Sequence, residues 1–135
     1  MTKILTVCLG NICRSPMAQG VLESKIRQRD LDMDVDSAGT ASYHIGEKPD
    51  ARAISKSNEY DIDISHYRGR QFALEDFEKF DYILTMDQSN YENVLFLAKT
   101  DEQKNKVKLM LNYLYPGENR SVPDPYYGGE SGFEN

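Results

Sequence analysis

The stretch that decides the fold occupies residues 5–18 and reads LTVCLGNICRSPMA. It begins with a short apolar run that is typical of a β-strand. Gly10 and Asn11 follow, and both tolerate left-handed backbone angles. Ser15 and Pro16 then indicate the start of a helix, with the serine hydroxyl as its cap and the proline at its first position, where a missing N–H costs little. The stretch therefore predicts a strand, a tight loop and a helix.

A loop between a strand and a helix N-terminus favours anion binding, because backbone N–H groups and the positive end of the helix dipole point at one place. Here the loop begins at the thiol of Cys8 and ends at the guanidinium of Arg14. Arg14 can hold two phosphoryl oxygens with its planar fork, and the setting favours a thiolate at Cys8. The hydroxyl of Ser15 can stabilise that thiolate when it leaves in a second step. The predicted phosphate-binding loop consists of Leu9, Gly10, Asn11, Ile12, Cys13, Arg14 and Ser15.

Cys8 alone would usually be interpreted as a small buried hydrophobic residue at the end of a strand. Its combination with Gly10, Asn11, Arg14 and Ser15 in this order favours a nucleophile instead. The loop lacks the Gly-Lys-Ser/Thr ending of a Walker P-loop and the G-x-G-x-x-G pattern of a dinucleotide site. We therefore interpret it as a loop that attacks phosphate.

The composition limits the classes of function. A chain of 135 residues is long enough for one domain with its own core. Its formal net charge of -6 lacks the basic balance of a nucleic-acid binder. No run is apolar and long enough for a signal peptide or a membrane span, so we expect a cytoplasmic protein without membrane contacts. Two cysteines five residues apart predict neither a disulfide framework nor a zinc site, and we expect no metal and no cofactor.

The rest of the chain alternates between strand and helix patterns. Expected strands cover residues 3–7, 34–39, 81–86 and 107–111, and expected helices cover residues 16–29, 49–60, 74–80 and 88–98. Loops are expected at residues 40–48 and from residue 115 onward. This alternation predicts a parallel sheet with helices on both faces, and ligands bind such sheets at the carboxyl ends of the strands, where the Cys8 loop lies.

The last residues contain a capping box, with Ser131 as the cap and Glu134 three residues later. This motif announces a helix, yet the sequence stops one residue after it. We expect that a final C-terminal helix is missing, and the alternative is a polar tail.

Residues 7–18 resemble the signature of the low-molecular-weight protein tyrosine phosphatases. The similarity continues through DSAGT at residues 36–40, FDYILTMD at residues 80–87 and VPDPYYG at residues 122–128, so it covers nearly the whole chain. We therefore expect a single phosphatase-like α/β domain over residues 1–135. Its architecture would be a three-layer α/β/α sandwich on a four-stranded parallel sheet in the order 2-1-3-4.

The resemblance implies metal-free hydrolysis in two steps through a phosphocysteine. Cys8 matches the family nucleophile and Arg14 matches its phosphate-binding arginine. Asp124 matches the general acid that protonates the leaving phenolate and then acts as the base on water. Alone, Asp124 before Pro125 would be an ordinary turn-former, so this role depends on the resemblance.

The resemblance also implies a network that supports the loop. Asn11, Ser15 and Ser37 match residues whose side chains hydrogen-bond to one another and hold the strained loop. The family often adds a histidine, but the matching position here is Tyr67, and His66 lies one residue early. The contribution of these two residues stays open.

The substrate cleft is implied by four positions. Tyr43, Tyr126 and Tyr127 match aromatic residues that line the family's cleft, and a deep aromatic slot suits phosphotyrosine. Ile12 stands where relatives that resemble protein arginine phosphatases carry threonine, so it favours phosphotyrosine. The implied partners are phosphotyrosine-containing proteins, with inorganic phosphate or similar oxyanions in the site.

The resemblance also bears on redox regulation and on alternative functions. Cys13 resembles a redox partner that protects the nucleophile by a reversible disulfide in some relatives. Arsenate reductases share the fold but need further cysteines, and none follows Cys13. An arginine phosphatase, or a non-catalytic phosphate-binding or redox-sensing module, is the remaining alternative function.

Overall fold

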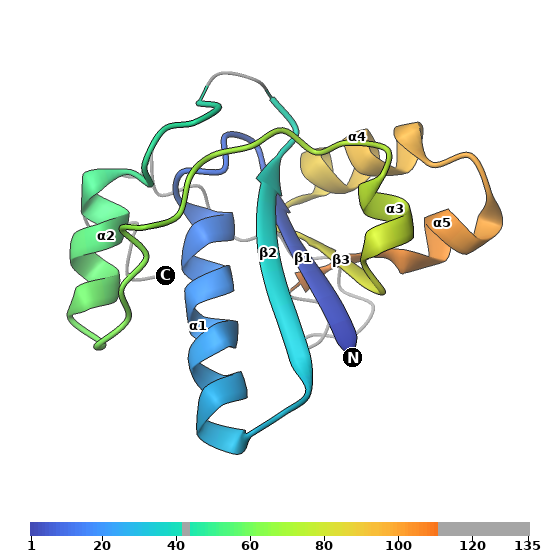
Figure 1. Cartoon of the computed structure of the whole chain (residues 1–135). Coiled ribbons are helices and arrows are strands. Elements are labelled where there is room, and N and C mark those ends of the chain that lie inside the picture. The colour runs from blue at the N-terminus through green and yellow to red at the C-terminus, as the bar shows by residue number, and fades with distance from the viewer. Residues whose placement is uncertain (42–43, 111–135) are drawn as a thin grey trace.

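Four parallel strands form the sheet, in the order β2-β1-β3-β4. A computed structural model describes residues 1–41 and 44–110 of the chain (Figure 1). The strands are β1 (Thr2–Cys8), β2 (Met33–Gly39), β3 (Tyr82–Thr85) and β4 (Val107–Leu109). The predicted parallel sheet and its strand order are confirmed.

Helices cover both faces of this sheet. The helices are α1 (Arg14–Arg29), α2 (Ala51–Asn58), α3 (Asp76–Lys79), α4 (Gln88–Leu97) and α5 (Asp101–Lys106). Figure 1 shows α1 and α2 on one side of the sheet and α3, α4 and α5 on the other. The predicted three-layer arrangement is therefore present within the described residues.

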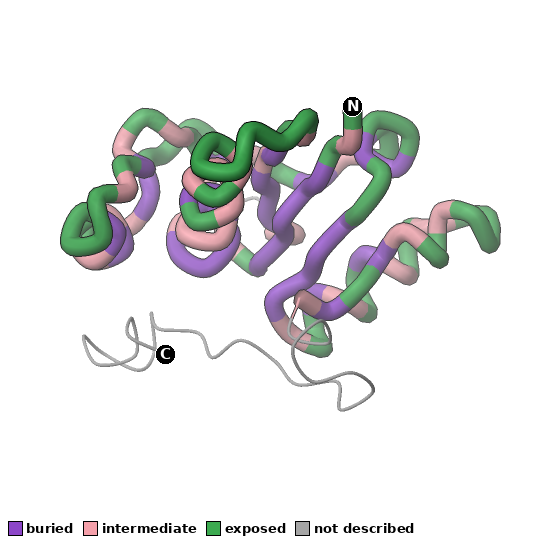
Figure 2. Tube along the Cα trace, turned by 90° about the horizontal axis from the view of Figure 1, so that it is seen from below, coloured by how far each residue is buried: buried purple, intermediate pink, exposed green. Residues whose placement is uncertain are grey.

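Strand β1 explains why both layers are needed. Ile4 packs with α1 residues in one apolar cluster, whereas Leu5 belongs to a second cluster with Phe77 of α3 and Val94 of α4. Successive side chains point to opposite faces of a strand, so an apolar strand buried on both faces requires helices on both sides. Buried positions accordingly follow the central strands in Figure 2. The loop after β1 therefore starts from a rigid element.

Helix α5 is absent from the sequence prediction. None of its residues is buried, so its sequence carries no apolar periodicity. Its start does carry a signal, because Thr100 accepts a hydrogen bond from the Gln103 N–H at 3.1 Å and Gln103 Oε1 accepts one from the Lys99 N–H at 2.7 Å. This pair of hydrogen bonds resembles a capping box, and the spacing of Thr100 and Gln103 in the sequence is the signal that predicts the start of this helix.

The start of α1 also differs from the prediction. The helix begins at Arg14, its N-cap is Cys13, and no side chain caps it. The prediction that Ser15 caps this helix was therefore wrong. Ser15 lies inside the first turn with its hydroxyl directed to Cys8, while Pro16 still occupies the first turn, where an N–H has no helical partner.

The expected loop from residue 115 and the capping box at Ser131 and Glu134 lie outside the described residues, as does the expectation of a missing final helix. Among the described residues, no helix combines the length and the apolar character that a membrane crossing requires.

Candidate active site

The Cys8 loop connects the carboxyl end of β1 to the N-terminus of α1, as predicted. Asn11 takes a left-handed backbone angle, with φ of 58°. Gly10, the other residue predicted to tolerate this region, does not occupy it, but a Cβ at Gly10 would lie 3.0 Å from Cδ2 of His44. The tight turn thus depends on the backbone of Asn11 and on the small size of Gly10.

The thiol of Cys8 faces two hydrogen-bond partners from the loop. Its Sγ accepts from the N–H of Asn11 at 3.2 Å and lies 3.0 Å from the hydroxyl of Ser15. The side chain is buried, at 3% exposure. The sulfur therefore lies between a backbone N–H and a hydroxyl of the same loop.

Arg14 is held at the same end of the sheet by Asp87. The guanidinium Nη1 of Arg14 donates to Oδ2 of Asp87 at 2.7 Å, and the arginine side chain is only 5% exposed. Asp87 is the N-cap of α4, and its other oxygen accepts from the N–H of Asn90 at 2.7 Å. The sequence places Asp87 directly before the expected helix at residues 88–98 and predicts no contact with Arg14. Its position at the end of the FDYILTMD motif was the available signal for a second role.

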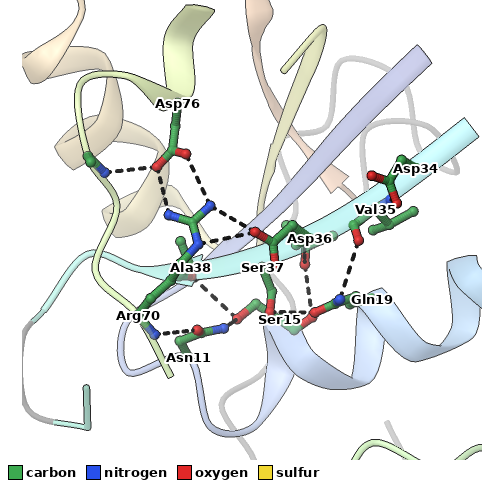
Figure 3. Close-up of polar contacts among 12 residues, drawn as sticks. Asn11, Ser15, Gln19, Asp34, Val35, Asp36, Ser37, Ala38, Arg70 and Asp76 are labelled. Atoms are coloured by element: carbon green, nitrogen blue, oxygen red, sulfur yellow. Dashed lines mark hydrogen bonds and ion pairs between the residues drawn. The ribbon is translucent and has the colours of Figure 1, made fainter. Parts of the chain in front are cut away.

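The structure brings together Asn11 and Ser15, two of the three residues expected to support the loop. Nδ2 of Asn11 donates to Oγ of Ser15 at 2.8 Å, and the same hydroxyl lies 3.4 Å from the carbonyl oxygen of Ala38 (Figure 3). Oδ1 of Asn11 accepts from the backbone N–H of Arg70 at 2.9 Å. The role of Arg70 was not anticipated from the sequence.

Ser37 does not take the role that was predicted for it. Its hydroxyl donates to Oε1 of Gln19 at 2.7 Å, and Nε2 of Gln19 donates to the carbonyl oxygen of Val35 at 3.3 Å. Ser37 therefore joins β2 to α1 one turn beyond Ser15, instead of bonding to Asn11 or Ser15. The two serines are close in space, but their hydroxyls serve different contacts.

Tyr67 and His66 lie away from the thiol network. The Tyr67 hydroxyl donates to Oε2 of Glu23 on α1 at 2.6 Å. Burial, followed by the hydrogen bond and the charge of Glu23, raises the pKa of Tyr67 above its ordinary value. His66 is exposed and packs its ring edge against Tyr67, with ring centroids 4.5 Å apart.

The end of β2 forms a wall of the loop. A Cβ at Gly39 would lie 2.8 Å from the carbonyl oxygen of Leu9 and 3.1 Å from the N of Asn11. Just beyond, the N–H of Thr40 donates to the carbonyl oxygen of Cys8 at 2.9 Å. Glycine is therefore required at this position for close contact between two backbones.

Of the remaining predicted site residues, some lie within the part of the chain that the structure describes and others lie outside it. Leu9 is exposed, Ile12 is half-buried, and Cys13 is buried; Cys8 and Cys13 are both reduced. Asp124, Tyr43, Tyr126 and Tyr127 lie outside the described residues. Within residues 1–41 and 44–110, no group of three or more His, Cys, Asp or Glu residues is arranged to hold a metal ion.

Comparisons with known proteins agree with this geometry. Residues 3–135 match the sequence model of the family described as low molecular weight phosphotyrosine protein phosphatase. The phosphatase of that name from Schizosaccharomyces pombe is 41% identical, over 98% of this chain and 88% of its own length.

Two solved structures also align along nearly the whole chain. The protein tyrosine phosphatase of Entamoeba histolytica, with Hepes in its active site, superposes with a TM-score of 0.92 and 39% identity, covering 99% of this chain and 86% of its own. A drosophila arginine phosphatase superposes with a TM-score of 0.90 and 36% identity, covering 98% and 87%.

Proposed function

This chain belongs to the low molecular weight phosphotyrosine protein phosphatase family, and from that premise we propose that it hydrolyses phosphotyrosine in proteins through a phosphocysteine intermediate. The observation that carries the proposal is the environment of Cys8. Its sulfur lies between the Asn11 N–H and the Ser15 hydroxyl, in the loop that ends at Arg14 and opens α1. Such a setting favours a nucleophilic thiolate beside an anion site.

In the first step, the Cys8 thiolate attacks phosphorus, the S–P bond forms and the bond to the aryl oxygen breaks. Asp124 donates its proton to the departing phenolate oxygen. Arg14 holds two phosphoryl oxygens as the phosphorus becomes planar, and its bond to Asp87 limits the directions in which its fork can point.

In the second step, water attacks the phosphocysteine. Asp124, now a carboxylate, takes a proton from the water, the S–P bond breaks, and inorganic phosphate leaves. The Ser15 hydroxyl, 3.0 Å from the sulfur, stabilises the returning thiolate. The reaction requires no metal, so we expect chelators to leave the rate unchanged.

The aryl substrate is favoured by Ile12 together with the three tyrosines at positions 43, 126 and 127. An aromatic cleft accommodates a flat phosphotyrosine, whereas phosphoserine is too short to bring its phosphorus to Cys8. Cytoplasmic location and a regulatory disulfide between Cys8 and Cys13 belong to the same proposal.

The drosophila arginine phosphatase makes phosphoarginine the second candidate substrate. Paired peptides of one sequence, carrying phosphotyrosine or phosphoarginine, decide between the two. We expect kcat/KM to favour phosphotyrosine by at least about 10-fold, and Ile12→Thr to reduce that ratio. A preference of the wild-type chain for phosphoarginine would replace the proposed substrate.

The general acid is tested separately with Asp124→Asn. Loss of the acidic limb of the pH–rate profile, with slower hydrolysis of phosphotyrosine, is the expected result. Unchanged turnover would remove Asp124 from the mechanism. A wild-type chain that binds inorganic phosphate but hydrolyses neither peptide would favour the non-catalytic binding module.

A further inference from the structure

Arg70 connects three parts of the fold beside the Cys8 loop. Its guanidinium donates twice to the carboxylate of Asp76, at the start of α3, at 3.0 Å for each bond. Its Nε donates to Oδ2 of Asp36 on β2 at 3.2 Å. Its backbone N–H donates to Oδ1 of Asn11 at 2.9 Å (Figure 3). One residue thus joins β2, α3 and the phosphate-binding loop.

The contact with Asp76 is the firmest of these. Asp76 is 3% exposed, and its Oδ2 also accepts from the N–H of Ala73 at 2.9 Å. Burial alone lowers the pKa of Arg70, but the hydrogen bonds and charges of Asp76 and Asp36 outweigh burial and raise it. A bidentate arginine–carboxylate contact fixes both the orientation of the guanidinium and its distance from the carboxylate. The guanidinium is therefore anchored on the side of residue 70 that faces α3.

The backbone of the same segment is anchored on β2. The N–H of Gly39 donates to the carbonyl oxygen of Arg70 at 2.8 Å, and the N–H of Phe72 donates to the carbonyl oxygen of Gly39 at 2.7 Å. These bonds form a short parallel bridge between Gly39 and Gln71. Asp76 consequently fixes the side chain of Arg70, and Gly39 fixes its carbonyl group. With both groups fixed, the N–H of Arg70 points at Asn11.

The direction of the hydrogen bonds then follows from Asn11. A backbone N–H can only donate, so the atom of Asn11 that faces Arg70 must be the amide oxygen. The amide nitrogen therefore faces Ser15 and donates to its hydroxyl oxygen at 2.8 Å. Because the Ser15 oxygen is accepting, its single hydrogen is available to Cys8 Sγ at 3.0 Å, the nearer of its two other neighbours. The backbone N–H of Arg70 thus orients the Asn11 amide, and through that amide it directs the Ser15 hydrogen toward the sulfur of Cys8.

We propose that Arg70 is a positioning residue for the reaction: its ion pair with Asp76 holds the N–H of residue 70 on Asn11 and so directs the Ser15 hydroxyl to Cys8. This inference rests on the proposed role of Cys8 as the nucleophile. Arg70 itself touches neither the sulfur nor the substrate. Its effect on the reaction passes through Asn11.

The primary variant is Arg70→Met, which retains an unbranched side chain and removes the contacts with Asp76 and Asp36. Its matched control is Arg68→Met, two residues earlier, because the exposed guanidinium of Arg68 donates to the carbonyl oxygens of Ser65 and Tyr67. For hydrolysis of an aryl phosphate, we expect kcat to fall at least about 10-fold in Arg70→Met, since small displacements of reacting groups carry large costs. We expect Arg68→Met to match the wild-type chain.

A second readout reports on the sulfur without turnover. The rate at which iodoacetate alkylates Cys8 at neutral pH, measured by peptide mass spectrometry, depends on the thiolate. We expect this rate to fall in Arg70→Met and to be partly restored in Arg70→Lys, which keeps one charged contact with Asp76. A purely structural role would lower the melting temperature and leave kcat and the alkylation rate of the folded protein unchanged, and that result would overturn the proposal.

A double-mutant cycle tests the route through Asn11. Asn11→Gly removes the amide and retains the left-handed backbone angle. If Arg70 acts through Asn11, Arg70→Met lowers kcat less than about 2-fold in the Asn11→Gly background, since coupled residues are not additive. A full further loss in that background would overturn the proposal.

The outcomes separate this inference from the proposed function. If the wild-type chain hydrolyses no aryl phosphate, the proposed function fails, and the alkylation rates still decide whether Arg70 controls Cys8. If the wild-type chain is active and Arg70→Met equals it, only the inference fails. Where Arg70→Met does not fold, as judged by circular dichroism, Arg70→Lys is judged by the same two ratios against Arg68→Met.

Discussion

The guanidinium of Arg14 and the carboxylate of Asp87 meet at 2.7 Å, which joins the first turn of α1 to the N-cap of α4. Asp87 has two tasks in this contact, because one oxygen caps α4 and the other holds Arg14. The capping role and the charged role can be separated by substitution.

Asp87→Asn should separate these roles. Asparagine caps helices as well as aspartate, so the cap contributes equally in both proteins, while Arg14 loses a charge-assisted hydrogen bond. We expect kcat/KM for an aryl phosphate to fall about 10-fold, because such bonds contribute about 1.5–3 kcal/mol. Asp87→Ala should show the same kinetic loss and, in urea unfolding, a further loss of about 1 kcal/mol from the cap. Wild-type kinetics in Asp87→Asn would contradict a role in holding Arg14.

The two serines near the loop provide a second test. Ser15→Ala removes the hydroxyl beside Cys8 and should lower kcat about 10-fold or more, in line with the loss of one donor at a charged site. Ser37→Ala leaves Oε1 of Gln19 without its 2.7 Å donor and should cost about 1–3 kcal/mol of stability, with kcat changed less than about 2-fold. Steady-state kinetics and urea unfolding of both variants check this contrast. A large kinetic loss in Ser37→Ala would restore it to the loop network.

Gly39→Ala should displace the phosphate-binding loop, because residue 39 on β2 packs against the backbone of that loop. The added Cβ would lie 2.8 Å from the carbonyl oxygen of Leu9, which is backbone and cannot move aside alone. We expect a loss of about 1–3 kcal/mol in the free energy of unfolding, as in other overpacked sites. Binding of inorganic phosphate should weaken in the folded protein, as measured by calorimetry. Wild-type affinity would mean that the loop adapts to the extra carbon.

Tyr67 predicts an alkaline loss of stability. Burial and Glu23 raise the pKa of Tyr67 above its ordinary value of 10.0, so the folded protein keeps the phenol proton where the unfolded chain has lost it. The unfolded state then binds fewer protons, and stability falls as pH rises. This contribution is fully present below about pH 10 and is lost above it. The free energy of unfolding of the wild-type chain should therefore fall more steeply than that of Tyr67→Phe across this range. Parallel curves for the two proteins would contradict the assignment.

The sequence contained most of what determines the fold and the centre of the site. The apolar run before Cys8 and the alternation of patterns after it predicted the sheet, because burial on two faces leaves a plain signature. The position of Cys8 between a strand and a helix predicted N–H groups near the thiol, because a loop that opens a helix directs such groups to one place.

The errors fall on polar residues whose partners are distant in sequence. The partners of Ser37 and Asp87 could not be deduced from local pattern, since Gln19 and Arg14 are far away along the chain. Ser15 matches a helix cap by its local sequence, but it lies inside the first turn of α1, where its hydroxyl contacts the sulfur of Cys8. Helix α5 lacks an apolar face, so only its cap could have revealed it.

Covalent bonding of phosphate to Cys8 is the central step of the proposed mechanism. The wild-type chain should be mixed with an aryl phosphate, quenched with acid within the first turnovers, and digested for peptide mass spectrometry. We expect the added phosphoryl mass on the peptide that contains Cys8, and neither this mass nor turnover in Cys8→Ser. Hydrolysis that persists in Cys8→Ser, or a phosphoryl group on another residue of the active wild-type chain, would contradict the account.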